Sequence, residues 1–171
     1  MLAAVALCVL LPQSPSPAPA LDLLPAADIH LDGWLGARIQ ASRTQWLDRV
    51  DLAPRIAPFA HRPAEQAWAG EHLGKWLHAA SSAWAESGDE VLRTRIASAV
   101  DALLAAQGDD GYLGAYLPAQ RFQLLPGADW DVWTIKYALL GLLAEHEATG
   151  DARALDAARR GADLLLKTFG E

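Results

Sequence analysis

The sequence predicts an all-α fold built from helical hairpins. Apolar residues recur at spacings of three and four along several long segments, which is the period of a helix buried on one face. No segment alternates polar and apolar residues for long enough to indicate a strand. Two long helical segments each end in a Gly-Asp turn, at Gly88-Asp89 and Gly150-Asp151, and a second helical segment follows each turn.

The expected elements follow one another in a simple order. A short segment, 21–33, leads into the first helix. The expected helices span 34–52, 71–86, 89–106, 131–148 and 152–169. Pro54, Pro58 and Pro63 predict a loop over 53–70, because proline lacks the backbone N–H that a helix needs. A second long loop, rich in glycine and aromatic residues, is expected over 108–129.

The two hairpins are related by an internal repeat. At an offset of 62 positions, Asp101 matches Asp163 and Gly108 matches Gly170, in register with the two Gly-Asp turns. Hairpins of this kind cannot bury both faces alone, so they stack on one another. We therefore expect 71–86 and 131–148 to be adjacent, nearly parallel inner helices, with 89–106 and 152–169 outside them. No polar capping repeat closes the series, so the chain is interpreted as the front part of a longer protein.

Composition limits the classes of function. The 171 residues are 52% hydrophobic, and 14 basic residues against 21 acidic ones give a net charge of −7. This composition is globular, and the acidic balance argues against a nucleic-acid partner. The single cysteine, Cys8, excludes a disulfide framework and a thiolate metal site within this chain. No cofactor is expected in the chain itself, and the composition leaves the oligomeric state open.

The N-terminus is typical of a secretory signal. Residues 1–20 carry no charged side chain, and an almost unbroken apolar run extends from Leu2 to Leu11, too short to span a bilayer. Ala18-Pro19-Ala20 offers the small residues of a cleavage site. We expect a signal peptide over 1–20, a secreted or periplasmic mature protein, and no membrane association after cleavage.

Three motifs carry a resemblance to a known family. They are Gly-Glu-His-Leu-Gly-Lys-Trp-Leu-His from Gly70, Gln-Gly-Asp-Asp-Gly-Tyr-Leu-Gly from Gln107, and Trp-Asp-Val-Trp-Thr-Ile-Lys-Tyr from Trp130. Their order and spacing resemble the N-terminal part of the β-L-arabinofuranosidases, glycoside hydrolase family 127 and its relatives. The resemblance implies an (α/α)6 barrel, incomplete here. Residues 34–171 would be the N-terminal part of its catalytic domain, truncated at the C-terminus.

The resemblance also implies where the chemistry lies. Family members resemble retaining glycosidases with a cysteine nucleophile beside a zinc ion, held by residues of the later barrel. Zinc is therefore implied for the full-length protein, and no catalytic residue is expected in this chain, which should be inactive alone. The implied partner is an oligosaccharide or glycoside substrate, whose glycosidic bond is hydrolysed in a plant-type or microbial glycan. One position departs from the pattern, because Trp130 stands where the family has a histidine.

Six residues at the expected helix starts and loop borders are candidate substrate contacts. Aromatic rings stack on sugar C–H faces, and carboxylates and imidazoles bind sugar hydroxyls. The candidates are Trp68, Glu71, His72, Tyr112, Trp130 and Asp131. The acids also have a purely structural interpretation. Glu71 and Asp131 would be first-turn acids that the helix dipole stabilises, and Asp110 would be a turn residue. Trp76, Trp84 and Tyr137 fall on helical stripes and are expected in the core. Trp133 borders a helix start, so its ring is a further candidate for stacking on sugar.

No metal site is expected from the histidines, and two other classes of function stay open. His61 and His146 are expected on the surface, and His72 and His78 do not share a helix face.

One alternative is a non-catalytic helical-repeat module that binds carbohydrate or protein, which would leave acids unclustered at the helix starts. The other alternative is a different (α/α)6 glycosidase.

Overall fold

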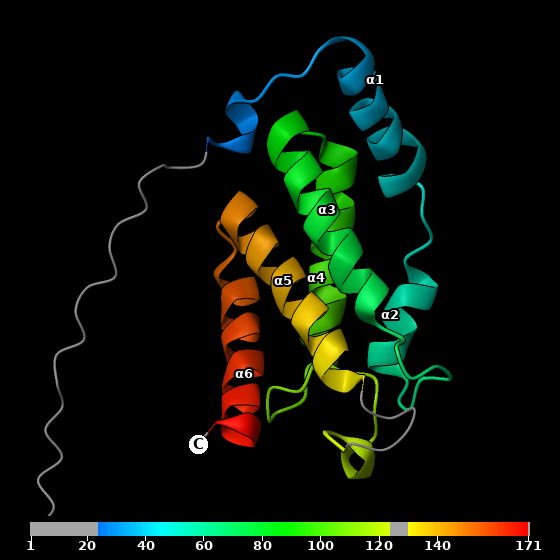
Figure 1. Cartoon of the computed structure of the whole chain (residues 1–171), viewed down its shortest axis with the longest axis vertical. Coiled ribbons are helices and arrows are strands. Elements are labelled where there is room, and N and C mark those ends of the chain that lie inside the picture. The colour runs from blue at the N-terminus through cyan, green and yellow to red at the C-terminus, as the bar shows by residue number, and fades with distance from the viewer. Residues whose placement is uncertain (1–23, 124–129, 171) are drawn as a thin grey trace, which may run out of the picture.

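The computed structural model describes residues 24–123 and 130–170, and within those ranges the chain is helical without strands (Figure 1). Long loops connect the helices at one end of the molecule, and tight turns connect them at the other. The helices are α1 (Gly33–Ser42), α2 (Ala53–Ala60), α3 (Glu71–Ser87), α4 (Glu90–Ala106), α5 (Asp131–Thr149) and α6 (Ala152–Phe169). Short turns of helix lie at Ala26–Asp28, Arg43–Leu47 and Pro118–Gln120.

Helices α3 and α5 pack directly against each other and run in the same direction (Figure 1). Glycines make this close approach possible: a Cβ added to Gly74 would lie 2.2 Å from the Tyr137 carbonyl oxygen. A Cβ added to Gly141 would lie 3.1 Å from the Leu77 Cβ. The contacts advance along both helices together, so the prediction of adjacent, nearly parallel inner helices is confirmed.

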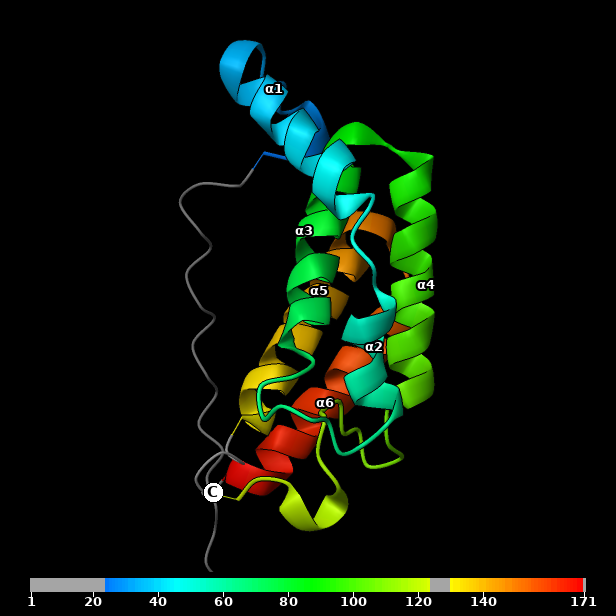
Figure 2. The ribbon, with the colours of Figure 1, turned by 90° about the vertical axis from the view of Figure 1, so that its right-hand side faces the viewer.

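Helices α4 and α6 return along the outer side of this pair (Figure 2). Each hairpin turns at a glycine in the left-handed region, Gly88 at φ 65° and Gly150 at φ 77°. The next residue then caps the returning helix: Asp89 accepts the backbone N–H of Val91, and Asp151 accepts that of Arg153. The sequence prediction of both turns and both returning helices is confirmed, with boundaries displaced by at most a residue.

Two hydrophobic clusters hold the hairpins and the second loop in place. The main cluster contains residues of all the helices from α2 through α6, among them the fully buried Trp76 and Leu142. A smaller cluster packs part of the 108–123 loop onto α5 through Tyr112, Tyr116 and Ile135. The loop is therefore fixed against the start of α5 by burial of its own aromatic residues.

The structure corrects the expectation for residues 34–70. The predicted helix over 34–52 ends at Ser42, widens into a π-type turn at Arg43–Leu47 and then leaves the helical path. The Trp76 indole donates to the Leu47 carbonyl at 3.2 Å, so this carbonyl is satisfied without a following helical turn. The expected loop over 53–70 contains α2, because Pro54 lies in its first turn, where a missing N–H costs nothing.

Other expectations for single side chains have mixed outcomes. Trp76 is in the core as predicted, whereas Trp84 and Tyr137 are only half-buried. His61 and His78 are exposed, but the prediction for His146 was wrong. The His146 ring is half-buried, and its Nδ1 lies 3.0 Å from the Asp151 carbonyl oxygen, so it secures the second tight turn.

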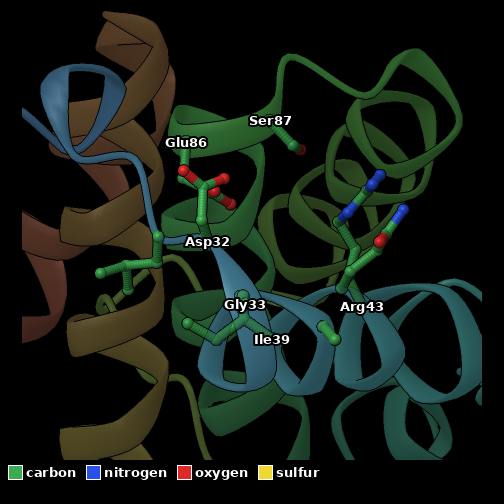
Figure 3. A pocket seen from close by; sticks show the side chains of 10 residues that line it. Asp32, Gly33, Ile39, Arg43, Glu86 and Ser87 are labelled. Atoms are coloured by element: carbon green, nitrogen blue, oxygen red, sulfur yellow. The ribbon is translucent and has the colours of Figure 1, made fainter.

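Helix α1 has no buried residue and stands apart from the hairpins. A groove of about 380 Å³ separates it from the end of α3. Figure 3 shows Asp32 and Glu86 on one side of this groove and Arg43 on the other. Within the described residues, no helix has the length and apolar character needed to cross a membrane. The predicted signal peptide lies outside the described residues.

Candidate functional site

The candidate site lies where α3 and α5 begin, at the end of the molecule that carries the long loops (Figure 1). Gly70 precedes α3 at φ 103°, with Thr134 and Phe59 packed against it, so this turn has room only for glycine. Trp130 precedes α5. Neither helix start carries a side-chain cap, in contrast to α4 and α6. The first turns of the two parallel helices therefore place their side chains beside one another.

Four aromatic rings form a continuous row across this end. Ring centroids are 6.2 Å apart for Trp68 and Trp130, 6.0 Å for Trp130 and Trp133, and 5.1 Å for Trp133 and Tyr137, each pair edge to face. Edge-to-face packing fixes each ring relative to the next. Trp68 remains 45% exposed, and Trp130 and Trp133 each remain 38% exposed, so the row presents aromatic surface to the outside.

The Glu71 carboxylate is buried beside this row, and both of its oxygens have partners. Its Oε2 accepts the indole N–H of Trp133, and its Oε1 lies 3.2 Å from Lys75 Nζ and 3.3 Å from His72 Nδ1. Burial raises the pKa of this carboxyl, but the hydrogen bonds from Trp133 and Lys75 and the charges of Lys75 and His72 hold it below its usual value. Glu71 is therefore an anion with fixed orientation, and the His72 ring beside it is exposed.

Two lysines cover the far half of the aromatic row. Lys136 Nζ lies 3.8 Å from the Trp133 ring centroid and 4.3 Å from that of Tyr137. Lys75 Nζ lies 4.5 Å from the Tyr137 centroid. These cation–π contacts occupy the faces of Trp133 and Tyr137. Among the described residues, no lysine or arginine lies over the faces of Trp68 or Trp130, so these two rings are exposed and free of cation–π contacts.

Asp131, at the start of α5, is turned inward. It is 1% exposed, and its two oxygens accept the backbone N–H groups of Phe122 at 2.7 Å and of Val132 at 3.0 Å. Burial raises its pKa despite these hydrogen bonds. Asp131 is thus a first-turn acid that ties the preceding loop to the helix, and both of its oxygens are used within the protein.

Tyr112 lies behind the site and has no exposed surface. Its hydroxyl accepts the backbone N–H of Tyr116 at 3.1 Å, and the Arg121 guanidinium lies 3.7 Å from its ring centroid. Burial raises the pKa of the phenol. Asp110 is a turn residue as predicted, since it accepts the Tyr112 N–H at 3.1 Å and pairs with Arg121 at 2.8 Å. This part of the loop supports the site from within.

The structure thus divides the six candidate residues into two sets. Trp68, Glu71, His72 and Trp130 gather at the aromatic row, whereas Tyr112 and Asp131 are buried beneath it. Lys75 and Lys136 were not among the candidates, and Trp133 was expected to stack on sugar, whereas its indole N–H bonds Glu71. A signal for Lys75 was present, because Glu71 and Lys75 are four residues apart on one helix. The bond from Trp133 to Glu71 depends on the pairing of α3 with α5, which no local pattern contains.

The described residues form no zinc site of their own, and the zinc implied by the family resemblance would be held by the later part of the barrel. Within 24–123 and 130–170, no three His, Cys, Asp or Glu side chains converge as metal ligands. The closest pairing, Glu71 with His72, already holds the Lys75 ammonium, whose charge opposes a cation there. Cys8 lies outside the described residues.

The fold is part of an (α/α)6 barrel, in which parallel inner helices are covered by outer return helices. Aromatic and acidic residues cluster at the starts of the inner helices, where barrel enzymes have their sites. The model of the family described as Beta-L-arabinofuranosidase, GH127 catalytic domain, matches residues 24–171. The chain therefore belongs to this family of glycoside hydrolases. The resemblance found in the sequence motifs is confirmed.

Individual relatives agree with this assignment. The chain is 31% identical over 104 residues to the non-reducing end β-L-arabinofuranosidase of Bifidobacterium longum, an alignment that covers 56% of this chain and 16% of that one. It superposes on a GH127 β-L-arabinofuranosidase from Geobacillus stearothermophilus T6 with a TM-score of 0.70 at 21% identity, covering 82% of this chain and 26% of that one. A second GH127 β-arabinofuranosidase gives a TM-score of 0.69 at 22% identity, with coverages of 84% and 26%. The chain thus spans about a quarter or less of the length of these relatives.

Proposed function

We propose that this chain supplies one wall of the glycoside-binding site of a β-L-arabinofuranosidase-type glycoside hydrolase. The observation that carries the proposal is the exposed row of aromatic rings around the Glu71 carboxylate, at the starts of two parallel inner helices. Sugars offer apolar C–H faces and polar hydroxyl edges, and this surface offers matching aromatic faces and a charged acceptor. The relatives named for β-L-arabinofuranosidase activity support a terminal arabinofuranosyl group as the sugar.

The residues have distinct proposed roles. Trp68 and Trp130 stack on the sugar, since their rings are exposed and free of cation–π contacts, and Glu71 accepts a hydrogen bond from a sugar hydroxyl. Hydrogen bonds to charged groups contribute roughly 1.5–3 kcal/mol each. His72 lies on the exposed side of Glu71 and reaches a second hydroxyl. Asp131 and Tyr112 hold the loop and helix start in place beneath the sugar.

The chain supplies no catalytic residue in this proposal. A glycosidase needs two carboxyl groups, or a carboxyl group and another nucleophile, on opposite sides of the scissile bond. Both Asp131 oxygens accept backbone N–H groups, and Glu71 is held as an anion by Trp133 and Lys75, so neither is free to donate a proton. The proposal therefore keeps the expectation that the described residues are inactive alone.

The test uses the intact protein and an aryl β-L-arabinofuranoside. Glu71→Ala should lower kcat/KM by about one to two orders of magnitude, because a charged hydrogen bond to the substrate is lost. Glu147→Ala is the matched control, since Glu147 is an exposed glutamate at the tight-turn end of α5, and it should change kcat/KM by less than about twofold. Equal losses in both folded variants would contradict the proposal. Binding of the glycoside without turnover would instead favour the non-catalytic binding module.

We also propose that the protein is exported. The support is the apolar run from Leu2 to Leu11 and the small residues at Ala18 and Ala20. N-terminal sequencing of the protein recovered from its host should give a start after residue 20. A mature protein that keeps Met1 would contradict this prediction.

A further inference from the structure

Trp133 differs from its neighbours in the aromatic row in how its ring is used. Its face is occupied by the Lys136 ammonium, 3.8 Å from the ring centroid, and its edges contact Trp130 and Tyr137. Its indole N–H is directed at Glu71 Oε2. Trp133 is therefore the one tryptophan of the described row that is bonded to the carboxylate, and a lysine lies over a face of its ring.

The Glu71 side chain depends on this indole for its orientation. Glu71 lies in the first turn of α3, where its long side chain has several rotamers and no backbone N–H within reach is shown to bind it. Lys75 and His72 both lie near Oε1, whereas Trp133 alone binds Oε2 in the described structure. The indole comes from the neighbouring helix, so it fixes the carboxylate relative to α5 and to the exposed rings of Trp68 and Trp130.

We propose that Trp133 is a positioning residue for substrate binding, which acts by holding Glu71 as an oriented hydrogen-bond acceptor and does not itself contact the sugar. This inference rests on the proposed function of the site. Trp133 binds one oxygen and Lys75 the other, and a carboxylate has about four lone-pair directions. Acceptor capacity therefore remains for a sugar hydroxyl, and its direction is set by the two partners.

The proposal predicts a specific pattern of kinetic effects. Trp133→Phe removes the N–H and keeps an aromatic face for the Lys136 ammonium. In the intact protein acting on an aryl β-L-arabinofuranoside, it should raise KM about tenfold and change kcat by less than about twofold. In the Glu71→Ala background the same change should have no further effect, because a residue acting only through Glu71 has nothing left to orient.

Trp84→Phe provides the matched control. Trp84 is also a tryptophan of the α3/α5 pair, at the opposite end, and its buried indole nitrogen has no hydrogen-bond partner within the described structure. Trp84→Phe should leave KM and kcat unchanged within about twofold. If Trp133→Phe still lowers kcat/KM about tenfold in the Glu71→Ala background, Trp133 contacts the substrate itself and the proposal is overturned.

A spectroscopic measurement separates this inference from the proposed function. Each tryptophan gives one indole ¹H–¹⁵N resonance, and Trp133→Phe identifies that of Trp133 by its loss, as Trp84→Phe identifies that of Trp84. Glu71→Ala should shift the Trp133 resonance, because a hydrogen bond to a carboxylate is removed, and should leave that of Trp84 in place. An unshifted Trp133 resonance overturns the positioning role even if the enzyme acts on arabinofuranosides. A shifted resonance in a protein without turnover keeps the positioning role and contradicts the proposed function.

Discussion

The two ends of the helical hairpins are built in different ways. At the tight-turn end, the same device occurs twice: a left-handed glycine, Gly88 or Gly150, is followed by an aspartate that caps the returning helix. At the loop end, the starts of α3 and α5 share no device, since one follows Gly70 and the other Trp130, and neither is capped by a side chain. The repeated end is explained by folding requirements alone, whereas the other end is not.

The loop end instead carries groups that folding does not require. A carboxylate, two lysines and four aromatic rings from separate segments meet there, with much of the aromatic surface exposed. Exposed aromatic surface gains no stability from burial, so folding alone does not account for it. The repeat therefore accounts for the tight-turn end of the hairpins, and the groups at the loop end support the proposal that this end binds a ligand.

The largest expected effect concerns the helix pairing that both ends share. Gly74→Ala would place a Cβ 2.2 Å from the Tyr137 carbonyl oxygen, so α3 and α5 must separate. We expect the free energy of unfolding to fall by about 3 kcal/mol or more, measured by chemical denaturation. Gly88→Ala is the control, because its Cβ would meet open space and only the left-handed backbone is disfavoured, at a cost of about 1 kcal/mol. Equal costs for the two changes would contradict the close parallel packing.

A smaller effect is expected at the tight-turn end. Asp89 accepts the backbone N–H of Val91 at 2.9 Å and of Leu92 at 3.2 Å, and it pairs with Arg43. Asp89→Ala should lower the free energy of unfolding by about 1–2 kcal/mol, as for other lost helix caps. Its kcat/KM should stay within about twofold of the parent value, with exposed Glu90→Ala as the control. A large loss of activity in the folded Asp89 variant would show that this end also serves the substrate.

The smallest expected effect is a pH dependence at the loop end. Because the pKa of Glu71 is lowered on folding, its contribution to stability is present above its usual value of 4.5 and is lost as pH falls through the lowered pKa. Around it, His72 and Lys75 lie on α3, and Lys136 lies on α5 against Trp133. Glu71→Gln should therefore cost more stability at pH 7 than at pH 3 in parallel denaturation series. A cost that is equal at both pH values, or larger at pH 3, would contradict the bonding of this carboxylate.

The two ends of the hairpins also differ in how far the sequence could predict them. The tight turns depend on residues adjacent in the chain, such as Gly150 and Asp151, so their place and the helices around them were predicted almost to the residue. The break at Leu47 was missed because its carbonyl is satisfied by Trp76, which lies far along the sequence.

The same distinction applies to the candidate site. Glu71 and Trp130 were found because helix starts are readable from local pattern. Whether a residue at a helix start faces outward depends on tertiary partners, and Phe122 draws Asp131 inward while Tyr116 engages the Tyr112 hydroxyl. Trp133 lies 62 positions from its partner Glu71, so its role follows only from the packing of α3 on α5.

The central claim is that the loop end of α3 and α5 binds the glycoside. A crystal structure of the intact protein with methyl β-L-arabinofuranoside tests it most directly. We expect the sugar ring in van der Waals contact with Trp68 or Trp130, and a sugar hydroxyl within hydrogen-bond distance of the Glu71 carboxylate. A sugar bound in the groove beside α1, at Asp32 and Glu86, or at any place that touches neither these two tryptophans nor Glu71, would contradict it.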